Sequence, residues 1–172
     1  PRFKYGITLD AAWKGFDFSI FMQGIGKRDL WLDGCYFWGA NGQGNEWQST
    51  GFAEHWDFFR PEGDPLGANL NSYYPRVNFS GDRNTKVQTR YLQNGAYLRL
   101  KNVQLGYTLP RVWTEKAGIS SVRVYVSGDN LATITSLSKI FDPEATGSLA
   151  GTGSGKLYPL QRVISVGVNV NF

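Results

Sequence analysis

RVISVGVNVNF, residues 162–172, is the stretch of sequence that decides the fold of this chain. Apolar residues occupy every second position from Ile164 to Phe172, and small or polar residues stand between them. A period of two indicates a β-strand with one apolar and one polar face. The length of the segment suits a tilted strand that crosses a bilayer, which needs about 9–11 residues. A half-buried strand of a soluble antiparallel sheet has the same pattern, so the remaining segments must distinguish the two.

Residues 3–13 and 16–26 show the same alternation and predict a hairpin. Lys14 and Gly15 form the expected two-residue turn, in which glycine supplies the positive φ that a tight hairpin requires. This loop length pairs Trp13 with Phe16, so the apolar rows of both strands share a face. Aromatic residues beside the turn are typical of the interfacial girdle of a membrane barrel.

Two further alternating segments bring the number of expected strands to five. The first has a shift in phase near Lys101 that indicates a bulge, and Pro110 to Gly118 predicts a short helix before the second. The connections are alternately short and long, as in transmembrane barrels, whereas long structureless loops are uncommon in ordinary domains. Five strands cannot close a barrel, which takes about eight. We therefore expect one section, 1–172, of a larger barrel, with strands at 3–13, 16–26, 97–109, 121–131 and 162–172 and long loops at about 27–88 and 133–161.

Composition excludes several other classes of protein. The single cysteine rules out an internal disulfide, and the lone histidine, His55, gives little support to catalysis. The net charge of +4 comes from scattered lysines and arginines, which argues against nucleic-acid binding. Asp142-Pro143-Glu144 is better explained as a turn than as a cation site. We expect no enzyme activity, no catalytic residues, no metal and no cofactor, and the start at Pro1 indicates a piece of a longer protein.

Several motifs occur in the order found in one family of transporters. They are YLRLKNVQLGYTLP at 97–110, VYVSGDNL at 124–131, FDPE at 141–144, YPL at 158–160 and the terminal strand. His55-Trp56, Pro61-Glu62 and Tyr74-Pro75-Arg76 resemble the loop pattern of the same family. The chain thus resembles the C-terminal part of a TonB-dependent outer-membrane transporter of the SusC/RagA type.

The resemblance implies an all-β fold, in which the chain supplies C-terminal antiparallel strands and long extracellular loops of a 22-stranded transmembrane barrel. A plug domain would lie outside this chain. The implied function is import of oligosaccharides or oligopeptides across the outer membrane of a Gram-negative bacterium. The implied partners are a SusD-like surface lipoprotein that acts as a lid, the TonB complex, outer-membrane lipid and the barrel-assembly machinery, for which Phe172 resembles the C-terminal signal.

Two sets of residues are candidates for function. Aromatic side chains of the long loop suit stacking on a substrate or contact with the lid, although such a long loop also needs a core of its own. That set is Trp31, Trp38, Trp47, Trp56, Tyr73 and Tyr74. Polar residues of the strands are expected to face the barrel lumen, where they would contact the plug or line the transport path. That set is Lys4, Asp10, Asp17, Gln23, Arg123 and Tyr125.

Two alternative functions fit parts of the pattern. A passive porin or another outer-membrane barrel would share the strands but lack a plug and a TonB box. A soluble carbohydrate-binding β-sandwich would share the alternation but would not need the alternately short and long connections.

Overall fold

The computed structural model describes residues 2–32, 34–40, 51–78, 83–146 and 157–172. These residues form two compact units. The sheet unit comprises 1–28, 95–136 and 160–172, and the loop unit comprises 29–94 and 137–159. Within the described ranges, no helix is long and apolar enough to cross a membrane.

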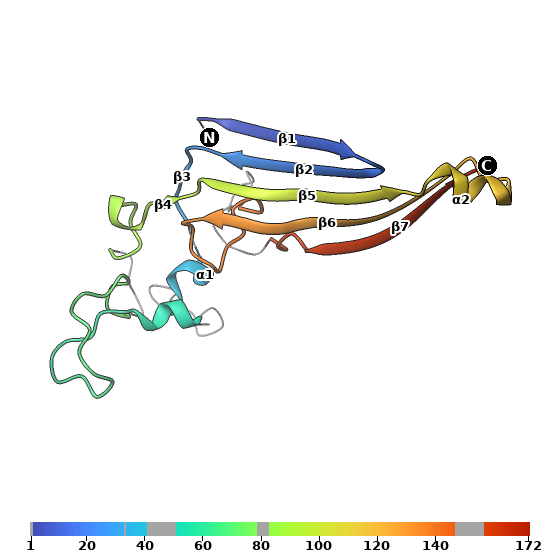
Figure 1. Ribbon diagram of the computed structural model, residues 1–172. Helices are drawn as coiled ribbons and strands as arrows, with labels where there is room; N and C mark the ends of the chain where they lie inside the picture. Colours follow the sequence, from blue (N-terminus) through green and yellow to red (C-terminus); the bar gives the residue numbers. More distant parts are fainter. Residues whose placement is uncertain (1, 33, 41–50, 79–82, 147–156) are drawn as a thin grey trace. The chain divides into compact units, whose positions relative to one another are not determined.

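The sheet unit is one antiparallel sheet of long strands with the order β1-β2-β5-β6-β7 (Figure 1). The strands are β1 (Lys4–Trp13), β2 (Phe16–Ile25), β5 (Tyr97–Thr108), β6 (Ser121–Thr135) and β7 (Val163–Asn171). Each of the five segments expected to form a strand overlaps one of them, with most ends within one residue of the expected ones. The expected end of the fourth strand at residue 131 is wrong, because Thr133 and Thr135 still pair with Arg99 and Tyr97 of β5. The second long connection therefore leaves the sheet after Thr135.

The β1–β2 hairpin has the register that its sequence predicts. Lys14 and Gly15 both have positive φ, 48° and 87°, as a tight two-residue turn requires. Trp13 lies opposite Phe16, and Ile7 lies opposite Met22. The predicted hairpin is confirmed.

The predicted bulge lies on β5 at Lys101. Phe21 of β2 pairs with Asn102, while the next residue, Met22, pairs with Leu100. The register between β5 and β6 shifts at the same place. One extra residue in β5 thus brings Leu100 and Val103 onto the same face despite their opposite parity in the sequence.

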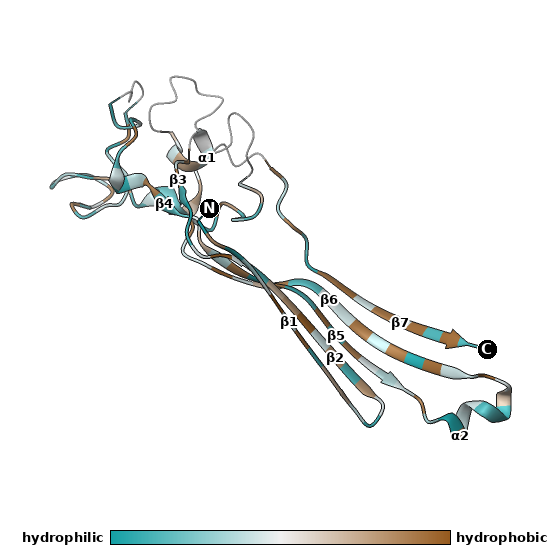
Figure 2. Cartoon of the chain, turned by 90° about the horizontal axis from the view of Figure 1, so that it is seen from above, coloured by the Kyte–Doolittle hydropathy of each residue, from teal (hydrophilic) through white to brown (hydrophobic). Residues whose placement is uncertain are grey.

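The register of all five strands gives the sheet one polar and one apolar face, and the alternation is visible along β6 and β7 in Figure 2. Many of the apolar side chains are exposed rather than packed into a core; Val166, for example, is 76% exposed. Exposed members of this apolar face include Leu9, Trp13, Phe16, Leu105, Val126, Ile164, Val166 and Val168.

The short connections lie at one end of the sheet, beside the C-terminus (Figure 1). Between β5 and β6 the chain forms α2 (Arg111–Thr114) and a 3-10 turn (Glu115–Ala117), which ends at Gly118 with a φ of 70°. The short helix predicted between Pro110 and Gly118 is confirmed. Phe172 follows the last residue of β7 and is exposed.

The loop unit has a small aromatic core, as its length predicted. Its regular elements are β3 (Asp29–Leu30) paired with β4 (Gln93–Asn94), α1 (Cys35–Trp38) and the 3-10 helices Ala53–Trp56 and Thr89–Tyr91. Phe37 is completely buried at the centre of this core. The two segments of the unit are joined by Glu54, whose carboxylate accepts hydrogen bonds from the Ser138 hydroxyl at 2.6 Å and the Lys139 backbone N–H at 3.0 Å. The buried members of the core are Leu32, Phe37, Trp38, Tyr74, Tyr91, Leu137 and Phe141.

Candidate functional site

An ion pair crosses the polar face of the sheet. Arg123 on β6 reaches over β5 to Asp17 on β2, with 2.8 Å between Arg123 Nε and Asp17 Oδ2, and its second contact is from Nη2 to Oδ1. The guanidinium also lies 5.0 Å from the centre of the Tyr125 ring. The strand between them carries Gly106 at this point, where a methyl group would collide with both charged groups. The absence of a side chain on Gly106 is therefore what allows the pair to form.

The six residues expected to face the lumen all belong to the polar face. Asp10 lies opposite Ser19 and therefore on the same face as Asp17, and Asp17 is followed across the sheet by Gly106 and Tyr125. Gln23 pairs with Arg99, which donates a hydrogen bond to Thr133 at 2.8 Å. The structure thus brings together, on one face, the set Lys4, Asp10, Asp17, Gln23, Arg123 and Tyr125.

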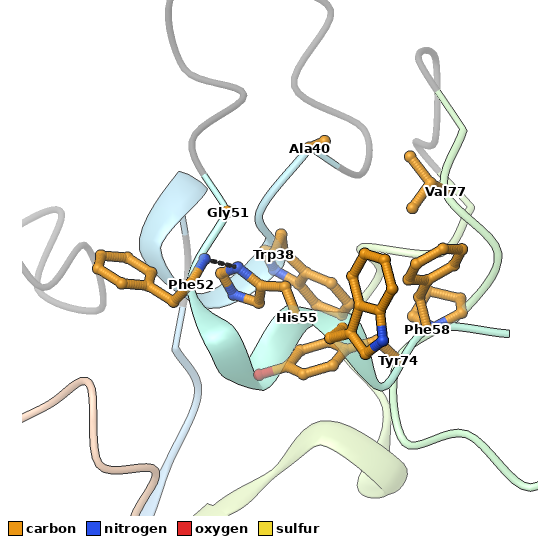
Figure 3. A pocket seen from close by; sticks show the side chains of 10 residues that line it. Trp38, Ala40, Gly51, Phe52, His55, Phe58, Tyr74 and Val77 are labelled. Atoms are coloured by element: carbon orange, nitrogen blue, oxygen red, sulfur yellow. Dashed lines mark hydrogen bonds between the residues drawn. The ribbon is translucent and has the colours of Figure 1, made fainter. Parts of the chain in front are cut away.

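The loop unit contains an apolar pocket of about 290 Å³ (Figure 3). Its walls are the rings of Trp38, Phe52, Trp56, Phe58 and Tyr74, and His55 lies between Phe52 and Tyr74. Trp56 is 60% exposed and meets Phe58 edge to face, with 6.1 Å between ring centres. The other lining residues are Ala40, Gly51, Pro75 and Val77.

His55 is held in one neutral tautomer. The backbone N–H of Phe52 donates to His55 Nδ1 at 2.9 Å, the bond drawn in Figure 3, so the ring proton must be on Nε2. Nε2 lies 3.0 Å from the carbonyl oxygen of Phe37 and donates to it. Burial lowers the pKa of His55 below its usual 6.5, outweighing the opposite effect of its carbonyl contacts. Both ring nitrogens are therefore already occupied within the protein.

We expect the loop unit to lose stability as the pH falls below about 6.5. Because the pKa of His55 is lower in the folded unit than in the unfolded chain, the unfolded chain binds more protons in this range. The stability that neutral His55 contributes is complete at pH values above the pKa of His55 in the unfolded chain. It is lost as the pH falls through the pKa of His55 in the folded unit. NMR titration of the full-length transporter measures this pKa, with the His55 signal assigned by its loss in H55Q. A pKa above 6.5 for His55 would contradict the assignment, and H55Q should abolish this part of the pH dependence.

The predicted loop aromatics occupy different environments. Trp38 and Tyr74 are buried in the core and also line the pocket, to which Trp56 contributes an exposed ring. Trp31 packs against the core beside Trp38, with 5.9 Å between ring centres. The partly buried Tyr73 accepts a 2.6 Å hydrogen bond from the side-chain amide of Gln93. Trp47 lies outside the described residues.

Three residues outside the set of six candidate aromatics also shape the pocket. Phe52 and Phe58 line it, and Arg60 stacks behind Phe58, with its guanidinium carbon 4.8 Å from the ring centre. Arg60 is itself buried and donates to the carbonyl oxygens of Trp56 and Gly67 at 2.9 and 2.7 Å. The signal in the sequence was the cluster of aromatic residues Trp56, Phe58 and Phe59, which ends at Arg60.

Asp142-Pro143-Glu144 forms a turn. The backbone N–H of Ala145 donates to the Asp142 carbonyl at 3.1 Å, and the Asp142 carboxylate accepts from the N–H of Glu144 at 2.8 Å. The predicted turn, with proline at its second position, is therefore confirmed. Across the described part of the chain, no group of three or more His, Cys, Asp or Glu side chains is placed to hold a metal ion.

Comparison with known proteins gives consistent similarities. No protein-family model matches the chain. It is 31% identical over 182 aligned residues to TonB-dependent receptor P3 of Formosa agariphila, and 29% identical to TonB-dependent receptor P26 of the same organism. Both alignments cover 100% of this chain, but 16% and 17% of the relatives, so the chain spans about one sixth of their length.

Solved structures give the same picture. The RagAB peptide transporter superposes with a TM-score of 0.71 and 27% identity over 97% of this chain and 17% of that one. The RagAB peptide importer in its closed-closed state also gives a TM-score of 0.71 and 27% identity, over 98% of this chain and 17% of that one.

Proposed function

This chain belongs to the SusC/RagA-type TonB-dependent transporters, which it resembles over its whole length, and we propose that it forms C-terminal strands of the outer-membrane barrel of an importer. The observation that carries the proposal is the two-faced sheet of the matched region. Its fold is the antiparallel sheet expected of such a barrel.

The exposed apolar face supports contact with lipid. Rows of Val, Ile, Leu and Phe side chains run across five strands, and the strands are 9–15 residues long. A soluble protein rarely leaves so wide an apolar surface uncovered, whereas a membrane barrel needs one about 25 Å tall. Trp13 and Trp113 at the end with short connections suit the headgroup region, where indole rings gather.

The polar face then lines the lumen. Ion pairs such as Arg123–Asp17 are costly in hydrocarbon but are satisfied in a polar interior. In this arrangement the long connections that form the loop unit are extracellular, and Phe172 lies at the periplasmic edge. There it would serve recognition by the barrel-assembly machinery.

The whole transporter would import oligosaccharides or oligopeptides without catalysis. Energy would come from the TonB complex through parts of the protein outside this chain, and a SusD-like lipoprotein would cover the extracellular side. The barrel would have 22 strands around a plug and lie in the outer membrane of a Gram-negative bacterium. RagAB is described as a peptide transporter, which makes oligopeptides the first class of substrate to test.

A pair of neighbouring substitutions in the full-length transporter tests the proposal. Val126 lies in the exposed apolar rows, and Ser127 faces the polar side of the same strand. An arginine on the lipid face near the bilayer midplane costs about 2–4 kcal/mol. We therefore expect V126R to reduce the amount of assembled transporter in the outer membrane strongly and S127R to leave it nearly unchanged.

Uptake tests the import step separately. Cells with wild-type or S127R transporter are given isotopically labelled casein peptides or labelled cell-wall oligosaccharides, with and without TonB. Uptake of at least one mixture should fall to the level of transporter-free cells when TonB is removed. Uptake that persists without TonB would indicate a passive porin, and equal assembly of both arginine variants would contradict the lipid-facing assignment.

A further inference from the structure

Trp38 lines the pocket of the loop unit and is otherwise buried in the aromatic core. Trp38 is 3% exposed, and its indole Nε1–H has no hydrogen-bond partner among the described residues. A buried donor left without a partner costs about 1–3 kcal/mol, so such groups are uncommon in folded proteins. Nε1 itself has less than 1 Å² of accessible surface, so other atoms of Trp38 line the pocket and a ligand does not reach this donor.

The size of the pocket limits what enters it. Its volume of about 290 Å³ lies at the lower end of the range for small-molecule pockets, about 300–1,000 Å³. That space suits one ring or one large side chain, not several units of an oligomer. A ligand would therefore insert one group here and leave the rest of its chain outside.

The chemistry of the lining favours an apolar group. Five aromatic rings form most of the wall, and the hydrogen-bonding atoms of His55 are already used by Phe52 and Phe37. A sugar ring carries several hydroxyl groups, and each would lose water on entry without finding a partner. An apolar side chain of a peptide needs none.

We propose that this pocket binds one aromatic or large aliphatic side chain of an oligopeptide. The side chain would stack against Trp56 and Phe58, which Arg60 supports from behind through its contacts with both rings. The inference rests on the proposed import of oligomers for the source of the peptide, but binding at this pocket is measurable without transport.

Three probes test the class of ligand on the purified intact transporter complex. They are acetyl-Gly-Phe-Gly-amide, its analogue with serine in place of phenylalanine, and a glucose trisaccharide, each titrated by calorimetry or saturation-transfer NMR. The phenylalanine peptide should bind most tightly. Tighter binding of the trisaccharide, or equal binding of the two peptides, would overturn the proposal.

Matched tryptophan variants test whether the peptide binds in this pocket. W56A removes an exposed pocket wall, while W113A removes a tryptophan of similar exposure from α2 in the sheet unit. We expect W56A to weaken binding of the phenylalanine peptide about tenfold, equivalent to about 1.4 kcal/mol, and W113A to leave it unchanged. Equal affinities of W56A and wild type would place the site elsewhere.

The outcome for the pocket and the outcome for import can be told apart. Peptide binding at the pocket without TonB-dependent uptake would support the pocket and reject the import proposal. TonB-dependent uptake together with an unchanged peptide affinity of W56A would support import and reject the pocket.

Discussion

Replacing Phe37 with alanine should destabilise the loop unit by about 4 kcal/mol. Phe37 is completely buried, and its ring lies 5.0 Å from Trp38, 5.7 Å from Tyr74 and 6.4 Å from Phe141, measured between ring centres. Truncation of a buried phenylalanine typically costs 3–5 kcal/mol, because transfer free energy is lost and a cavity remains. Tyr74 and Phe141 belong to distant segments, so the neighbouring rings cannot all move in to fill the space.

Hydrogen exchange on the full-length transporter measures this effect. Backbone amides near Tyr74 and Tyr91 should exchange much faster in F37A than in wild type, while amides of β5 and β6 keep their protection. L70A is the control, because Leu70 is exposed and its truncation should cost little. Unchanged protection near Tyr74 in F37A would show that the aromatic core does not stabilise this unit.

A single added methyl group at Gly24 should prevent normal assembly of the sheet. Tyr5 on β1 lies over Gly24 of β2, and its hydroxyl donates to the carbonyl oxygen of Tyr97 on β5 at 3.3 Å. A methyl group at Gly24 would lie 2.5 Å from that carbonyl oxygen and from the Tyr5 ring. The carbonyl belongs to the backbone of the adjacent strand and cannot move aside alone, so we expect G24A to cost about 3 kcal/mol, at the upper end of overpacking.

The matched control is G6A on the neighbouring strand. A methyl group at Gly6 would lie 3.3 Å from the ring of Phe21, a side chain that can shift by a few tenths of an ångström. The measurement is the fraction of full-length transporter that reaches the outer membrane in folded, heat-modifiable form. G24A should lower that fraction severely and G6A little, and equal fractions for both would refute the steric argument.

Strand pairing was accessible from the sequence because alternation and turn chemistry agree locally. The two-residue turn Lys14-Gly15 allows only one register for the hairpin, and the shift in alternation near Lys101 predicts the bulge. The predicted resemblance to a SusC/RagA-type transporter is confirmed by the comparisons. The end of β6 was misjudged because Asn130, with a φ of 52°, interrupts the pattern before pairing resumes.

The pocket was not accessible in the same way. Its walls come from segments far apart in the chain, and nothing in the local sequence tells whether an aromatic ring such as Trp38 is buried or Trp56 exposed. The lumen-facing set stays a prediction, although its members do share one face. The partners of these residues depend on which strands lie together: Arg123 and its partner Asp17 are 106 positions apart in the sequence.

The crossing of Arg123 over Gly106 restricts how the strands can align during assembly. Alternation alone excludes a slip by one residue, since that would turn every apolar side chain to the wrong face, but it tolerates a slip by two. Such a slip of β5 would bring Gln104 or Thr108 beneath the ion pair, and either side chain would keep Arg123 and Asp17 apart. Only the native alignment therefore places Gly106 between Arg123 and Asp17 and permits their charge contact across three strands.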